Sequence, residues 1–400
     1  MWVHTPEFRR IVGATKLSAC RASTFFSASE VGRSLFSDIP AIPLAMPSVE
    51  AARLEAVTCL SLDFVNLVAG ILGQRSSTTF EELLLCHSRT LDPLLPADSE
   101  AVSFMHKILG TANVSDYEID NKLRLLLKML RKARARVLAA ELATACADDP
   151  LRPRVERIMS GSKAGRVKMT LAGAIVEIGA EHYEKLFRLY TFTVIERSGI
   201  ELGGKNVDIF PRRDLKFQSA VFCMLCRYNA AQGGMHHMGG GHHTALHADV
   251  FDVLLVNFGV DAECFASPLN CRWRQYFSAH PDTDSLFGSL GSFFEFAPIE
   301  GSFECNPPFE EGLILRCAHH IDRLMKRAEW LGKPLSFIIF TPYWPGRAAW
   351  EALFQSAFRT YSDVVPLRDH GYVEVIYYSF VHLAAFIGVL FLFPVISIEF

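Results

Sequence analysis

Four consecutive side chains offer the clearest chemistry in this chain: Asn306, Pro307, Pro308 and Phe309. Each proline has a fixed φ angle and no backbone N–H, so we expect the carbonyls of this segment to face outward without a local partner. Asn306 adds an amide that accepts and donates hydrogen bonds, and Phe309 adds an apolar ring face. Acceptors in the plane of a stacked ring suit the exocyclic amine of an adenine. A simple turn after a buried strand would use the same residues, so their surroundings must decide.

Three apolar segments are predicted to be strands that bring such residues together. They cover residues 262–270, 301–305 and 334–342, and a helix over residues 313–330 separates the last two. Strand, helix and strand at this spacing form a βαβ unit of a parallel sheet, in which ligands gather at the carboxyl ends of the strands. Those ends carry residues 267–270, 306–309 and 341–344. The sequence therefore predicts an α/β domain with one site at this edge of its sheet.

Residues 50–200 are predicted to be helical, with Ser48 as the N-cap of the first helix. The clearest helix covers residues 120–146, in which one apolar stripe is formed by Leu123, Leu126, Leu127 and Leu130. The same helix carries seven cations: Lys122, Arg124, Lys128, Arg131, Lys132, Arg134 and Arg136. A second basic cluster consists of Arg152, Arg154, Arg157, Lys163, Arg166 and Lys168. Each cluster fits a solvated surface or a phosphate-contacting one, and their adjacency favours nucleic-acid binding.

The composition is typical of a folded protein in a reducing compartment. Of its 400 residues, 50% are hydrophobic and 21% are charged, which is enough to bury the cores of two or three domains. The net charge of −3 predicts no general attraction to polyanions, so any basic surface must be local. Ten cysteines show no framework spacing, and the one Cys-x-x-Cys pair, Cys223 and Cys226, has no second pair to complete a zinc site. We interpret both as core residues and expect no metal site.

Three further segments stand apart from these elements. Residues 232–243 form a loop rich in Gly and His, whose glycines allow close backbone approach to a cofactor and whose histidines lack the fixed partners of a metal site. Residues 1–50 are expected to be a flexible leader. The four cations and one acid of residues 1–29 resemble a mitochondrial presequence only weakly, and we favour an ordinary disordered start. The apolar residues 377–398 are long enough to span a bilayer, but we favour the final buried strands of the sheet.

The ordered set of motifs resembles the phosphorylated-CTD-interacting family of mRNA cap adenosine N6-methyltransferases. The resemblance is strong over about residues 220–370 and rests on residues 263–270, 274–276, 281–284, 287–289, 296–298, 301–304, 306–309 and 335–338 and on Trp344. It implies a Rossmann-like, S-adenosylmethionine-dependent methyltransferase core with an N-terminal helical domain. It also implies methylation of N6 of the 2′-O-methyladenosine beside the cap of mRNA. We therefore expect a leader over residues 1–50, a helical, basic, RNA-contacting domain over 51–215 and the methyltransferase domain over 216–400.

The resemblance also implies roles for individual residues. The catalytic set is Asn306, Pro307, Pro308 and Phe309, in which Asn306 and the Pro307 carbonyl accept hydrogen bonds from the adenine N6 while Phe309 stacks on the base. The cofactor would contact the same four residues together with Gly239, Gly240, Pro268 and Asn270. Capped RNA would contact Glu311, Trp344, Arg347, Asp369 and His370, and the basic helix would add Arg131, Lys132 and Arg134. This chemistry needs little acid–base catalysis, because proximity and alignment supply most of the acceleration.

One feature of the sequence departs from that family, and two alternative functions remain. The paired tryptophans of a WW module are not found at the spacing of a three-stranded sheet, so we expect no such module. Because that module binds the phosphorylated tail of RNA polymerase II, its expected absence makes this tail a doubtful partner. One alternative function is a non-catalytic cap-binding or RNA-binding relative. Another is a protein anchored in a membrane by its C-terminus. Modification of the mRNA cap implies that the protein is located in the nucleus, and the cytoplasm and the mitochondrion are alternative locations.

Overall fold

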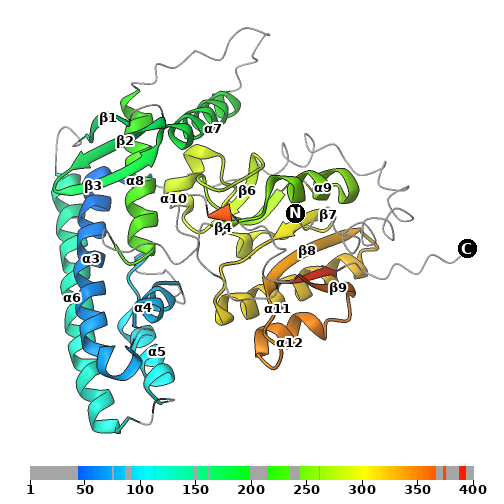
Figure 1. Cartoon of the computed structure of the whole chain (residues 1–400), viewed down its shortest axis with the longest axis horizontal. Coiled ribbons are helices and arrows are strands. Elements are labelled where there is room, and N and C mark those ends of the chain that lie inside the picture. The colour runs from blue at the N-terminus through cyan, green and yellow to red at the C-terminus, as the bar shows by residue number, and fades with distance from the viewer. Residues whose placement is uncertain are drawn as a thin grey trace, which may run out of the picture. The chain divides into compact units, whose positions relative to one another are not determined.

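The computed structural model describes residues 44–73, 76–85, 92–110, 112, 114–146, 152–160, 163–198, 214–234, 244–260, 262–365, 373–374 and 387–392. The predicted leader therefore lies outside the described residues, apart from its last few positions. The chain forms two compact units, one over residues 43–240 and the other over residues 241–400 together with 1–42 (Figure 1). We call them the helical unit and the sheet unit. The division at 240/241 lies downstream of the expected boundary at 215/216, so the last helix before the Gly/His loop belongs to the helical unit.

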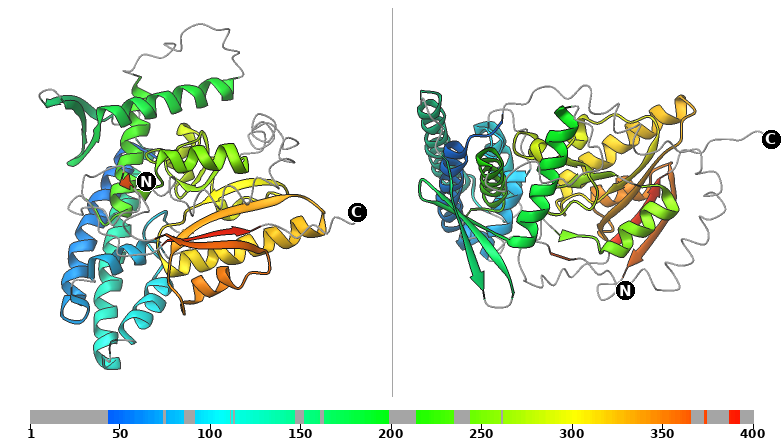
Figure 2. Two further views of the ribbon diagram at one scale, coloured as in Figure 1. Left: turned by 45° about the vertical axis from the view of Figure 1, so that its right-hand side comes forward. Right: turned by 90° about the horizontal axis from the view of Figure 1, so that it is seen from above.

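The helical unit is built on two long helices that lie side by side, α3 and α6 (Figure 2). Its helices are α3 (Pro47–Leu72), α4 (Ser76–Leu85), α5 (Asp98–Gly110), α6 (Asp116–Ala145), α7 (Ala180–Ser198) and α8 (Leu215–Ala231). In α6 the predicted stripe is confirmed at Leu123, Leu126 and Leu130, which are buried, whereas Leu127 is half-buried. Ser48 is not the N-cap of α3: the helix begins after Met46 with a proline at its first position, and Ser48 Oγ instead hydrogen-bonds Thr144 Oγ1 at 2.6 Å.

The prediction of continuous helix over residues 50–200 is wrong for one stretch. A three-stranded antiparallel sheet is formed by β1 (Arg154–Ser160), β2 (Lys163–Leu171) and β3 (Ala174–Gly179). In β2 the buried Val167 and Met169 alternate with more exposed cations, a period of two that helical reading overlooks. Positive φ angles at Ala172 (49°) and Gly173 (85°) close the β2–β3 hairpin as a two-residue loop. The second basic cluster therefore lies on and beside strands.

The sheet unit confirms the expected α/β class. Its mixed six-stranded sheet has the order β6-β5-β7-β8-β11-β9. The strands are β5 (Ala262–Ala266), β6 (Gln275–Ser278), β7 (Gly301–Cys305), β8 (Leu335–Pro342), β9 (Arg359–Val365) and β11 (Ile387–Leu392). The first four in space run parallel, and β11 is antiparallel to both of its neighbours, β8 and β9. A separate short pair is formed by β4 (Thr244–Ala245) and β10 (Val373–Glu374).

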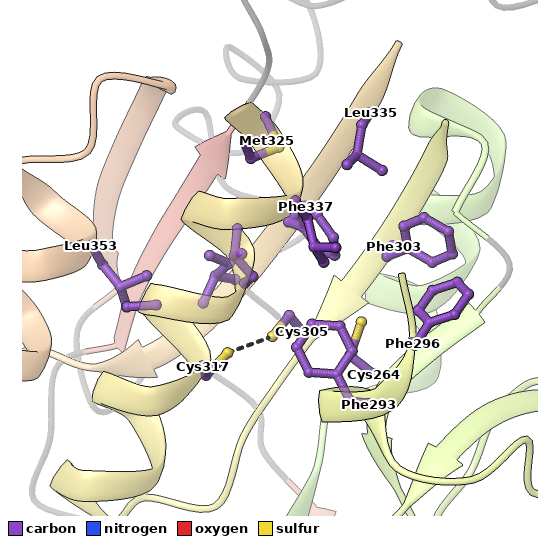
Figure 3. Close-up of a cluster of buried hydrophobic side chains, with 14 of the residues drawn as sticks. Cys264, Phe293, Phe296, Phe303, Cys305, Cys317, Met325, Leu335, Phe337 and Leu353 are labelled. Carbon is purple, nitrogen blue, oxygen red and sulfur yellow. Dashed lines mark hydrogen bonds between the residues drawn. The ribbon is translucent and has the colours of Figure 1, made fainter. Parts of the chain in front are cut away.

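Helices cover both faces of this sheet and bury β8 completely. The helix α11 (Glu311–Trp330) packs its Cys317 and Met325 against Phe303, Cys305 and Phe337 on one face (Figure 3). On the other face, α9 (Ala248–Phe258) packs against Ile338 and Phe340. Every residue of β8 is buried, as predicted for a strand inside a parallel sheet. The remaining helices are α10 (Pro281–Asp284), α12 (Ala348–Phe354) and the short 3-10 turns Ser285–Phe287 and Phe293–Glu295.

The apolar C-terminal run contributes a strand to the sheet. Residues 387–392 form β11, which pairs with β8 on one side and with β9 on the other. The preference for strand over membrane anchor is confirmed for these six residues, and the rest of 377–398 lies outside the described part of the chain. Among the described helices, one, α3, is long and apolar enough to cross a membrane. That helix carries the buried Glu50 and Arg53 and packs against α6 and α8, which is typical of a core helix.

Candidate active site

The order of the sheet creates a switch point between β5 and β7. From β5 the chain first continues to β6 on one side, and it then crosses to β7 and β8 on the other. Ligands of open α/β sheets bind at such a point, outside the carboxyl ends of the strands. Glu263 of β5 pairs in register with Glu304 of β7, and Cys305 of β7 pairs with Ile339 of β8. The three predicted strand ends are therefore brought to one edge of the sheet.

The turn that follows β5 is fixed by its own side chains. Asn270 Oδ1 accepts hydrogen bonds from the Ser267 backbone N at 2.7 Å and from Ser267 Oγ at 2.9 Å. The chain beyond the turn is held by Glu263, whose Oε1 accepts the backbone N–H groups of Arg272 at 2.7 Å and Trp273 at 2.9 Å. Pro268 is buried and Asn270 is half-buried. The predicted cofactor residues of this turn thus stand on a preorganised segment.

The Asn-Pro-Pro-Phe segment is held between the end of β7 and the start of α11. Glu310 caps this helix, and its carboxylate accepts the backbone N–H groups of Gly312 at 2.9 Å and Leu313 at 2.6 Å. Pro307 is buried, whereas Asn306, Pro308 and Phe309 are half-buried. One expectation is corrected here, because the Pro308 carbonyl has a local partner: it accepts the Glu310 N–H at 2.7 Å. The cap ties this carbonyl into the turn.

The segment after β8 meets the first turn of α11. Arg347 Nη1 lies 2.9 Å from Glu311 Oε2, and the Arg347 guanidinium lies over the Trp344 ring at 5.2 Å from its centroid. Arg347 is also the N-cap residue of α12, and Trp344 is half-buried. Arg347 therefore contacts both of the other predicted substrate residues of this region, Glu311 and Trp344. They form a polar and aromatic group beside the Asn-Pro-Pro-Phe segment, which ends two residues before Glu311.

The sheet beneath the site holds two buried acids that sequence reasoning missed. Glu263 is 3% exposed and Glu304 is 1% exposed. Burial, with the nearby charge of Glu263, raises the pKa of Glu304 well above its ordinary value. Glu304 Oε2 is buried without a hydrogen-bond partner among the residues that the structure describes. The available signal was a single acid inside each of two predicted strands, Glu263 between Ala262 and Cys264 and Glu304 between Phe303 and Cys305, where an apolar residue is typical.

The thiols near the site are not suited to nucleophilic catalysis. Cys305 directly precedes Asn306, and its Sγ lies 3.4 Å from Cys317 Sγ (Figure 3). Burial raises the pKa of both thiols well above the usual range, which keeps them protonated. Cys223 and Cys226 are buried in α8, as expected for core residues. Within the described residues, no group of three or more His, Cys, Asp or Glu side chains is arranged to hold a metal ion.

The other predicted site residues are not among the described residues of the sheet unit. Gly239, Gly240, Asp369 and His370 lie outside the described residues. Arg131 and Arg134 belong to the helical unit, where both bind Asp98; Arg131 Nη2 lies 2.7 Å from Asp98 Oδ2. Lys132 is exposed on the same helix.

The sheet unit thus presents an α/β fold with a switch-point site, and comparison of the sequence with known proteins indicates the class. A family model described as "Phosphorylated CTD interacting factor 1 WW domain" matches residues 185–375. The chain is 38% identical over 225 residues to the mRNA (2′-O-methyladenosine-N(6)-)-methyltransferase of Homo sapiens and 37% identical over 225 residues to that of Mus musculus. Each match covers 56% of this chain but 29% of the relative, so the chain matches less than a third of each relative's length. These matches support the resemblance to this family.

The expectation that a WW module is absent conflicts with the family match. The description of the matching family includes a WW domain, so we withdraw that expectation. Among the described residues of the matched range, the strands belong to the six-stranded sheet and to the β4–β10 pair.

Proposed function

We propose that this chain is an S-adenosylmethionine-dependent mRNA methyltransferase that adds a methyl group to N6 of the 2′-O-methyladenosine beside the cap. The observation that carries the proposal is the position of the Asn-Pro-Pro-Phe segment at the carboxyl end of β7, next to the switch point with β5. The names of the similar proteins from human and mouse support it. A Rossmann-like core is part of the proposal, and the open, largely parallel sheet with helices on both faces supports it.

The residues at the strand ends fit a cofactor that carries a positive charge. Glu263 and Glu304 lie beneath the site, and Glu304 Oε2 is an orphaned buried oxygen. The preorganised turn of Ser267, Pro268 and Asn270 lies at the position where open α/β sheets bind nucleotides. When bound, S-adenosylmethionine supplies an electrophilic methyl group on a sulfonium sulfur. The chain's own task is then to bind, orient and align the accepting nitrogen.

In this mechanism the Asn-Pro-Pro-Phe segment aligns the adenine. Asn306 Oδ1 and the Pro307 carbonyl accept the two N6–H groups, which turns the N6 lone pair out of the ring plane toward the methyl group. Phe309 stacks on the base and fixes its plane. The Pro308 carbonyl is occupied by the Glu310 N–H, so it stiffens the segment rather than binding N6. Proximity and orientation of this kind account for large rate factors, provided that the reacting atoms are about 3–3.5 Å apart.

A methyl-transfer assay tests the proposal. The purified chain is incubated with radiolabelled methyl donor and with capped or uncapped RNA that begins with 2′-O-methyladenosine, and capped RNA that begins with guanosine is the control. We expect label in N6-methyladenosine from the capped adenosine RNA alone. A protein that binds the donor but transfers label to none of these RNAs would refute the proposed activity.

A second candidate function is non-catalytic binding of capped or other RNA. The exposed cations of α6, such as Lys128 and Lys132, favour it. It predicts RNA binding that survives Asn306→Ala and is lost when Arg131, Lys132 and Arg134 are reversed in charge. Measurable turnover that Asn306→Ala abolishes would exclude it.

The partners and location follow from the activity. We infer that capped mRNA is the substrate and that the protein acts on it in the nucleus. The cytoplasm and the mitochondrion are alternative locations, and cell fractionation would distinguish the three. Release of the protein from membranes into the soluble fraction on carbonate extraction would exclude the alternative of a C-terminal membrane anchor. The family description supports the phosphorylated tail of RNA polymerase II as a further partner, and binding to phosphorylated but not to unphosphorylated tail peptide would test it.

A further inference from the structure

The buried acids Glu263 and Glu304 are not used by the alignment mechanism described above. They are register partners on the adjacent parallel strands β5 and β7, so their side chains lie on the same face of the sheet. Their neighbours Cys264, Phe303 and Cys305 belong to the core on the opposite face. Two carboxyl groups therefore lie side by side in the interior, where two negative charges repel strongly.

The two acids differ in how the protein solvates them. Glu263 Oε1 accepts two backbone N–H groups, at 2.7 Å and 2.9 Å, and such bonds favour the carboxylate form. Glu304 Oε2 is buried without a hydrogen-bond partner among the described residues, an environment that favours the neutral form. The pair therefore shares one proton, which is held by Glu304 when the site is free of ligand.

Glu304 is also close to the proposed chemistry. It precedes Asn306 by two residues at the carboxyl end of β7. A proline follows Asn306 and restricts it to extended backbone, so the chain advances about 7 Å from Glu304 to Asn306 at about 3.3 Å per residue. Because Asn306 is proposed to align N6 with the sulfonium methyl group, the positive charge of the cofactor would lie near the buried pair. A unit charge about 10 Å away, at an effective dielectric constant of about 20, shifts a protonation equilibrium about tenfold.

We infer, on the basis of the proposed function, that the Glu263–Glu304 pair releases its proton to solvent when a sulfonium cofactor binds, and that it keeps the proton when the neutral thioether product binds. The methyl donor and the product differ by one positive charge at sulfur, so the ionised pair attracts the donor more strongly than the product. Discrimination between donor and product therefore increases with pH. The pair acts through the electrostatic field at the strand ends, and Glu304 is a positioning residue rather than a catalytic one.

Other titratable groups around the pair do not produce the same effect. Tyr276 of β6, the register partner of Glu263, donates its hydroxyl to the Phe287 carbonyl at 3.1 Å. β8 contributes the uncharged Ile338 and Phe340 to this face, and the thiols of Cys264 and Cys305 lie on the other face. The charged groups of α9 and its cap are His247 and Asp249, whose side chains are about half exposed, and the exposed Asp252. Asp252 is paired with Arg272 at 2.9 Å. Exposed groups are screened by solvent and do not distinguish donor from product by a whole proton.

Calorimetric titration tests this inference without measuring turnover. Binding of S-adenosylmethionine and of S-adenosylhomocysteine is measured between pH 6.5 and 9 in two buffers of different ionisation enthalpy, which gives the protons released per ligand bound. We expect the wild-type chain to release more protons with the donor, up to one extra, and its preference for donor over product to rise about tenfold over this range. Glu304→Gln keeps the neutral shape and should bind both ligands with no extra release.

Controls separate this inference from the proposed function. Glu263→Gln removes the like charge but not the burial of Glu304, so it should move the extra release to lower pH, and it replaces Glu304→Gln if thermal melting shows that variant to be unfolded. Glu329→Gln, an exposed acid of α11, should retain the extra release. Equal proton release with both ligands at every pH, or an unchanged difference in Glu304→Gln, overturns the inference alone. Failure to bind the methyl donor at all would refute the proposed function and this inference with it.

Discussion

Arg347 and Glu311 form an ion pair of 2.9 Å that joins the segment after β8 to the first residue of α11. The same guanidinium lies over Trp344. The pair lies beside the Asn-Pro-Pro-Phe segment, because Phe309 and Glu311 are only two residues apart, and we therefore propose that it contacts the rest of the RNA substrate.

Replacing Arg347 by Ala is expected to raise the KM for capped RNA about tenfold or more, because hydrogen bonds to charged groups contribute about 1.5–3 kcal/mol. The stability should change by less than about 1 kcal/mol, since the Arg347 side chain is exposed. Lys326→Ala, which removes an exposed ion pair with Asp322 on α11, is the matched control and should leave KM unchanged. An unchanged KM for Arg347→Ala would remove this residue from the substrate set.

Asn306→Ala is expected to lower kcat by about 10²–10³, because misalignment of the accepting nitrogen costs about a hundredfold or more. The affinity for the methyl donor should fall by less, so the two measurements separate alignment from binding. Asn257→Ala is the control: Asn257 also uses its amide in a hydrogen bond, to the Val253 carbonyl at 3.0 Å, but it lies on α9. If both variants lose activity equally, the loss reflects folding rather than chemistry.

Glu50→Gln is expected to destabilise the helical unit by about 3–5 kcal/mol, the usual cost of leaving a buried charge without its partner. Arg227 donates to Glu50 through Nε at 2.9 Å and Nη2 at 2.7 Å, and both side chains are almost fully buried. Glu118→Gln, which affects a partly exposed pair with Lys122, should cost less than about 1 kcal/mol. Urea denaturation measures both values, and equal costs would show that the Glu50 network contributes little.

Asp98→Asn is expected to strengthen RNA binding severalfold at low salt, because it releases Arg131 and Arg134 from their shared acid. Each new phosphate contact should steepen the dependence of binding on salt by about 0.9 in the log–log slope. Asp322→Asn on α11 is the control. Identical salt slopes for the wild-type and Asp98→Asn chains would exclude these two arginines from the RNA surface.

Glu304→Gln should flatten the dependence of stability on pH. The folded protein raises the pKa of Glu304, so the folded state holds its proton more tightly than the unfolded state does. Stability from this group is therefore present at low pH and is lost as pH rises from the ordinary Glu range through the folded pKa. In Glu304→Gln this loss should disappear, so the variant gains stability relative to wild type as the pH rises. Parallel stability curves for the two proteins, measured by denaturation from pH 5 to 9, would contradict the assignment.

Local patterns in the sequence predicted much of this fold. The predicted strands at 301–305 and 334–342 correspond to β7 and β8, and most of the leucine stripe of α6 is buried, because a period of two or 3.6 residues decides which face is apolar. The same reasoning missed β1, β2 and β3. There the cations alternate with buried Val167 and Met169, and the basic composition concealed the period.

By itself, the sequence determined the candidate residues at the strand ends, because the hydrogen-bonding and stacking capacity of proline, asparagine and aromatic residues follows from their residue type. Only the tertiary structure decided which groups become partners. The parallel register places Glu263 beside Glu304, and the crossing of two segments pairs Arg347 with Glu311. These partners are 41 and 36 positions apart in the chain. Contacts across such separations depend on how strands are ordered and registered, which no local pattern encodes.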